Sequence, residues 1–85
     1  MDQKKQDRID YIVFVLEQNI GRQIWYSYIV RNFATGDAVP ARHCFGLIGK
    51  DDRFFGGALL VEDLYDDEKL KILLIDMLSC SKGKI

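Results

Sequence analysis

The sequence has few cysteines, a single proline and no long apolar run, and each shortage excludes a class of protein. Two cysteines, Cys44 and Cys80, are too few for a disulfide framework and form no C-x-x-C pair. The longest apolar runs, YIVFVL and ILLI, are far shorter than the roughly 20 residues of a membrane-spanning helix. The charged start MDQKKQDRID lacks the apolar segment of a secretory signal. We therefore expect a cytoplasmic protein with reduced thiols and no membrane contact.

Motifs for catalysis, cofactors and metals are also missing. The chain has no G-x-x-x-x-G-K, G-x-G-x-x-G or H-E-x-x-H. His43 and Cys44 are the only nucleophile-and-base pair, with Asp37 in the neighbouring turn, but adjacent strand residues point to opposite faces. We expect a buried Cys44 and an exposed His43 without catalytic contact. Three Cys and His residues are too few for a usual four-ligand zinc site. The sequence predicts no enzyme, cofactor or metal.

The composition is that of one small globular domain, 1–85, with frayed ends at 1–5 and 80–85. Its residues are 48% hydrophobic and 12% aromatic, unlike a disordered chain. A chain this short buries only about 60–65% of its unfolded surface, so small domains often oligomerise for stability. Charge is uneven: a basic middle (Arg22, Arg31, Arg42, Lys50) precedes an acidic stretch (Asp51, Asp52, Glu62, Asp63, Asp66, Asp67, Glu68) and a basic tail (Lys69, Lys71, Lys82, Lys84). This indicates either complementary binding surfaces or ordinary solvated loops and helix ends.

Two segments have helical periodicity. From about Gln3 to Asn19, apolar residues recur at spacings of three and four, and Gly21 follows as a C-terminal cap (Ile9, Ile12, Val13, Leu16, Ile20). The competing strand through YIVFVL is disfavoured because strict alternation is missing. Asp66 is the expected N-cap of a last helix, which begins to fray between Ser79 and Gly83. Its apolar stripe is Leu70, Leu73, Leu74 and Met77.

Three strands are expected between the helices. Residues 23–33 alternate between an apolar or aromatic set and a mixed set, and the turn ATGDAVP leads to a returning strand, 41–48. A second turn, 49–52, precedes a third strand, 53–61, in which Gly56-Gly57 suggests a bulge or a close backbone approach. The alternative is a helix that begins after Gly57. Short connections favour an antiparallel meander, so the predicted fold class is α+β in two layers, with both helices on one face of the sheet.

Two surfaces are candidates for binding. On the helices, a second apolar patch lies opposite each core stripe (Tyr11, Phe14, Val15, Ile72, Ile75). A helix that is apolar on two sides is normally buried on two sides, and no further element remains to cover it. The leading hypothesis is therefore a non-enzymatic regulator, adaptor or inhibitor that binds a protein and forms a homodimer, of the kind found in phages and mobile elements. The alternative is single-stranded nucleic acid on the aromatic and basic strands (Trp25, Tyr28, Arg31, Arg42).

Overall fold

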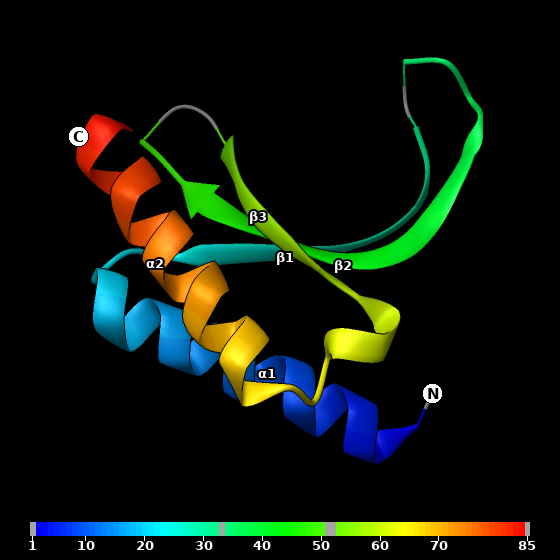
Figure 1. Cartoon of the computed structure of the whole chain (residues 1–85). Coiled ribbons are helices and arrows are strands. Elements are labelled where there is room, and N and C mark those ends of the chain that lie inside the picture. The colour runs from blue at the N-terminus through cyan, green and yellow to red at the C-terminus, as the bar shows by residue number, and fades with distance from the viewer. Residues whose placement is uncertain (1, 33, 51–52, 85) are drawn as a thin grey trace.

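The computed structural model describes residues 2–32, 34–50 and 53–84, the last five of these as backbone only. Its elements follow the predicted order: α1 (Gln3–Ile20), β1 (Ile24–Arg31), β2 (Ala38–Ile48), β3 (Arg53–Leu60), a 3-10 turn η1 (Val61–Asp63) and α2 (Asp67–Lys84). The strands form an antiparallel meander in the order β1-β2-β3, and both helices lie on one face of it (Figure 1). The two-layer α+β prediction is confirmed.

The predicted caps at Gly21 and Asp66 are confirmed, and Asp2 caps the start of α1. The Asp2 carboxylate accepts a hydrogen bond from the Lys4 N–H at 3.0 Å, and Gly21 ends α1 in the left-handed conformation (φ 76°). The Asp66 carboxylate accepts from the N–H of Glu68 at 2.9 Å and of Lys69 at 3.4 Å, which confirms it as the N-cap of α2. The backbone of α2 is helical to Lys84. Fraying of residues 1–5 and 80–85 stays a prediction.

The core lies between the helices and one face of the sheet. Its buried side chains come from α1 (Ile9, Ile12, Leu16), from the strands (Ile24, Phe45, Leu47, Leu59), and from the turn after η1 and from α2 (Leu64, Leu70, Leu73, Met77). Val13, Ile20 and Leu74, also predicted for the core stripes, are partly buried against it. The periodicity of both helices therefore identifies their core faces correctly.

The pairing of β1 with β2 is irregular near the hairpin that joins them. Ile29 pairs with Arg42 and Arg31 with Ala38, so β2 has two extra residues in the stretch that contains Pro40. The strand begins at Ala38 rather than at the predicted 41, because this irregularity absorbs a proline that cannot donate to a ladder. The hairpin of β1 and β2 curls away from the helices (Figure 1). Phe33, the predicted end of β1, lies outside the described residues.

The glycine pair in β3 forms the predicted bulge. Gly46 pairs with Phe55 and Phe45 with Gly57, which leaves Gly56 as the extra residue. A Cβ at Gly56 would lie 2.7 Å from Met77 Cε, and one at Gly57 would lie 2.6 Å from Leu73 Cδ1. The missing side chains therefore let α2 pack closely on β3. The alternative helix after Gly57 is wrong, because the strand continues to Leu60.

Candidate functional site

The face of the sheet opposite the helices has no described element packed on it, and its register sets out three rows of side chains. The first row joins Trp25, Gly46 and Phe55 across β1, β2 and β3, the second Ser27, Cys44 and Ala58, and the third Ile29, Arg42 and Leu60. Aromatic residues thus flank a glycine in the first row, small residues fill the second, and apolar residues flank an arginine in the third. We call this surface the open face.

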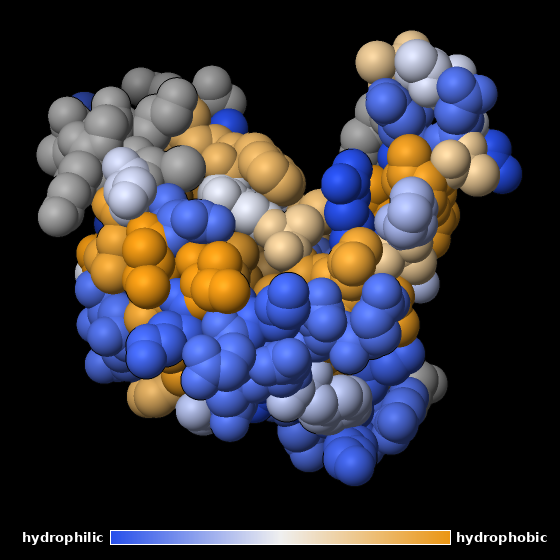
Figure 2. Space-filling view, in the orientation of Figure 1, coloured by the Kyte–Doolittle hydropathy of each residue, from blue (hydrophilic) through white to orange (hydrophobic). Residues whose placement is uncertain are grey.

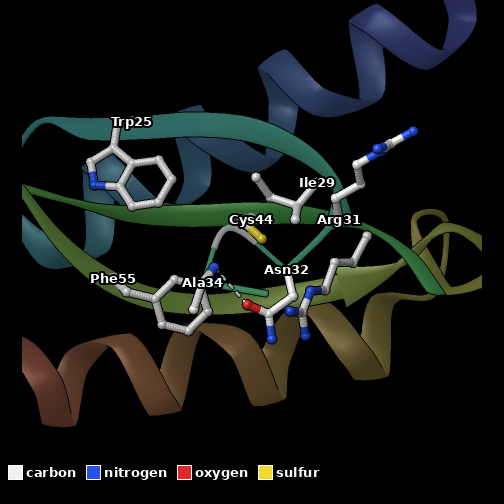
Figure 3. A pocket seen from close by; sticks show the side chains of 8 residues that line it. Trp25, Ile29, Arg31, Asn32, Ala34, Cys44 and Phe55 are labelled. Carbon is white, nitrogen blue, oxygen red and sulfur yellow. Dashed lines mark hydrogen bonds between the residues drawn. The ribbon is translucent and has the colours of Figure 1, made fainter. Parts of the chain in front are cut away.

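Trp25 lies flat across the open face because Gly46 leaves room for it. A Cβ at Gly46 would collide with the indole ring of Trp25 and with the carbonyl oxygen of Phe54. The indole N–H of Trp25 donates a hydrogen bond of 3.1 Å to the same oxygen, so the ring spans β2 and is fixed at both ends. Phe55, on the other side of Gly46, is 60% exposed. The two rings form an aromatic platform at one end of the open face (Figure 3).

The row of small residues leaves a hollow of about 420 Å³ beside this platform. Its walls are Trp25, Ile29 and Phe55, with Cys44 at the floor, and Asn32 and Ala34 come from the hairpin that curls over it (Figure 3). The hollow opens into a notch between the hairpin and the body of the molecule (Figure 2). An open apolar hollow with aromatic walls is a typical binding site.

The charge on the open face is positive. Arg42 and Arg31 both line the hollow and are exposed, and no carboxylate lines it among the residues that the structure describes. Arg31 lies at the rim, where its side chain extends outward (Figure 3). The described residues of the acidic stretch that follows β3 lie instead on η1 and around the start of α2 (Glu62, Asp63, Asp66, Asp67, Glu68). The open face therefore suits a ligand that carries negative charge and an apolar or flat group.

Tyr28, which the sequence predicts to act with Trp25, Arg31 and Arg42, does not lie with them in the structure. Its ring lies 5.4 Å from the ring of His43 on the helix side of the sheet, where both residues line a second hollow beside Asp2 and Lys5. Trp25, Arg31 and Arg42 do come together, and Phe55 and Ile29, which the sequence interpretation missed, join them. Tyr28 and Trp25 fall in opposite sets of the β1 alternation, so the strand pattern already separates them.

His43 is buried, which makes the prediction of an exposed histidine wrong. It is 1% exposed, and its Nδ1 lies 2.6 Å from the Tyr26 hydroxyl. Its Nε2 is buried and has no hydrogen-bond partner among the described residues. Burial lowers the pKa of the imidazole, and the positive charge of Lys5 adds to this effect. His43 shares the core-facing alternation of Phe45 and Leu47, which explains its position.

His43 and Cys44 serve opposite faces of the sheet, as predicted. Cys44 lies at the floor of the hollow on the open face and is buried, whereas His43 contacts Tyr26 and Tyr28 on the helix side. Burial raises the pKa of the Cys44 thiol, against an opposite effect of Arg42, so the thiol is protonated at neutral pH. Asp37 is exposed in the hairpin turn. Within residues 2–32, 34–50 and 53–84, no cluster of three or more potential metal ligands occurs.

The outer faces of the helices carry the second candidate surface. Tyr11, Phe14, Ile72 and Ile75 are 51%, 58%, 53% and 55% exposed, and Val15 is half-buried. Apolar side chains lie among charged ones on the surface over α2 (Figure 2). Ile72 also lines a shallow hollow between α2 and β3, beside Lys69 and Asp76. These faces have no cover from any described part of the chain.

Arg8 fixes the geometry at one end of this surface. Its guanidinium donates to the Leu64 carbonyl at 2.8 Å and to the Asp67 carboxylate at 2.9 Å, and it lies 5.4 Å from the centre of the Tyr11 ring. The start of α2 is thereby joined to α1, and Tyr11 is held in place by a cation–π contact. The apolar surface is therefore partly ordered before any partner binds.

None of the helices that the structure describes is long and apolar enough to cross a bilayer. No family model, curated protein or solved structure matches the chain.

Proposed function

We propose that this chain is a non-enzymatic protein-binding module, a regulator, adaptor or inhibitor of a larger partner, that associates with itself through the outer faces of α1 and α2. One observation carries the proposal: four large apolar side chains on these faces, Tyr11, Phe14, Ile72 and Ile75, are each more than half exposed. Patches of this kind on a small domain usually mark contact surfaces. A cytoplasmic location belongs to the proposal, because the free, buried Cys44 suits a reducing compartment.

The energetic argument compares this exposure with the stability of a small domain. Complete burial of one such side chain contributes roughly 1.5–3 kcal/mol. Each of the four side chains is about half exposed, so burial of the exposed part would contribute about half of that value. Over four positions, a contact could therefore gain about 3–6 kcal/mol. The whole stability of a small domain is about 5–10 kcal/mol. A two-fold interface recovers this free energy in a closed assembly, because each patch meets its own copy.

Light scattering coupled to size exclusion at micromolar concentration tests the proposal. The wild type is expected to have the mass of a dimer, and Phe14→Glu or Ile75→Glu to have that of a monomer, because an unpaired carboxylate is costly to bury. Phe55→Glu is a matched control, since Phe55 is equally exposed but lies on the open face. A monomeric wild type contradicts self-association, and a dimer split by Phe55→Glu alone contradicts the assignment to the helices.

A further inference from the structure

We propose that the open face of the sheet binds single-stranded nucleic acid, with bases stacked on Trp25 and Phe55 and phosphates held by Arg42 and Arg31. This site lies on the layer opposite the helices and does not depend on the association proposed for them (Figure 1). Three features of the open face support binding: its aromatic platform, its hollow and its charge. Beneath the hollow, residues 42–47 of β2 pair with both neighbouring strands.

The aromatic platform is built to offer ring faces. The one polar atom of the Trp25 side chain is already paired with the Phe54 carbonyl, so a ligand meets only the π-surface of the indole. The Phe55 ring is exposed on the far side of Gly46. Stacking of bases on such rings is insensitive to sequence, because every base has a flat π-surface. The platform therefore fits nucleobases in general rather than one base.

The hollow separates the aromatic platform from Arg42 by a distance that a nucleic-acid backbone can span. From the Trp25 row to the row of Ile29 and Arg42 is four residues along β1, or about 13 Å at the usual rise of a strand. The small side chains of Ser27, Cys44 and Ala58 keep the space between them open. A single-stranded nucleic acid with one base stacked on Trp25 can thus run through the hollow and place a phosphate at the guanidinium of Arg42.

The charge around the hollow favours a phosphate chain on this face. Arginine binds phosphate oxygens with two parallel N–H groups, and the described lining of the hollow includes two arginines and no carboxylate. The N-termini of both helices, where anions are also favoured, already hold carboxylates: Asp2 caps α1, and Asp66, Asp67 and Glu68 lie at the start of α2. The net charge of the chain is only −1, and the described carboxylates of η1 and of the start of α2 do not line the hollow.

An acidic peptide is the competing occupant, and the position of the hollow disfavours it. Extended peptides usually gain affinity by adding main-chain hydrogen bonds to the edge of a sheet. The hollow lies over β2, the central strand, whose backbone pairs with β1 and β3 on its two sides. A peptide there would have side-chain contacts alone, whereas a base needs only the ring faces that the site offers.

The fluorescence of Trp25, the single tryptophan, tests the site directly. An oligothymidylate of about ten nucleotides is titrated at about 50 mM salt, beside an abasic oligomer of equal charge and an acidic peptide of alternating glutamate and leucine. We expect the oligothymidylate to quench the fluorescence and to bind more tightly than the other two. No quenching by it at low salt, equal affinity of the abasic oligomer, or tighter binding of the peptide overturns the proposal.

Variants that keep Trp25 locate the contact. Phe55→Ala is expected to weaken binding roughly 5- to 150-fold, the effect of one lost stacking partner. Arg42→Gln is expected to lower the slope of log affinity against log salt by about 0.7, as one lost phosphate contact does. Tyr28→Ala, on the helix side, and Lys71→Gln, on α2, are matched controls expected to bind as the wild type does. If the Tyr28 variant loses as much affinity as the Phe55 variant, the open face is not the site.

Discussion

Substitution of Gly46 by alanine is the sharpest test of how the open face is built. A Cβ there would collide with the Phe54 carbonyl, which is backbone, and with the indole ring of Trp25. Its φ is not positive, so the added methyl acts by contact alone. Overpacking of this kind costs about 1–3 kcal/mol. Displacement of Trp25 also breaks its hydrogen bond to Phe54, for about 0.5–1.5 kcal/mol more. We expect a loss of about 2–4 kcal/mol.

Gly57→Ala is the matched control for that substitution. The new Cβ would lie 2.6 Å from Leu73 Cδ1, a terminal methyl that can rotate away, so we expect a change within about 1 kcal/mol. Urea unfolding followed by far-ultraviolet circular dichroism measures both variants, and Trp25 fluorescence reports the displaced ring. Gly46→Ala should lower the midpoint well below that of Gly57→Ala. Equal midpoints would refute the reasoning, because backbone and side-chain collisions would then cost the same.

Two further predictions concern the buried histidine and the cap of α2. The pKa of His43 is lowered in the folded state, so the unfolded chain binds a proton first as pH falls below about 6.5. The free energy of unfolding should therefore decrease as pH falls, by at most about 1.4 kcal/mol per pH unit. His43 is the single histidine, so urea unfolding between about pH 7 and 5.5 should show this decrease in the wild type but not in His43→Leu. An equal pH dependence of the two proteins would contradict the role of His43. Asp66→Ala should cost about 1 kcal/mol by the same measurement and Asp66→Asn much less, whereas equal losses would show that the cap hydrogen bond is unimportant.

The elements were predictable because each depends on a local pattern. Helix periodicity, the caps at Gly21 and Asp66, and the alternation of β1 act within a few residues, and the structure confirms them. The start of β2 was missed because the irregularity around Pro40 is set by pairing with β1. The exposure of His43 was wrong because it was judged from residue type, although its alternation with Phe45 and Leu47 places it on the core face.

The open face depends on register, which the sequence does not determine. Trp25 and Phe55 meet across Gly46 only because the bulge at Gly56 shifts the pairing of β3 by one residue. Without that shift, the side chain of Phe55 would point toward the helices. The sequence suggested a bulge at the glycine pair but not which neighbour it would move. For this reason Phe55 was absent from the predicted nucleic-acid set, while Trp25, Arg31 and Arg42 were present.

The topology also explains why two different surfaces exist on so short a chain. A meander with both helices on one side buries one face of the sheet and leaves the other face bare. The bulges at Pro40 and Gly56 curve this bare face, and curvature turns a flat row of small side chains into a hollow. The helices must supply the core on their inner side, so their remaining apolar residues can face only outward. The helix surface and the open face are therefore separated by the full thickness of the fold, and substitutions on one can be interpreted without reference to the other.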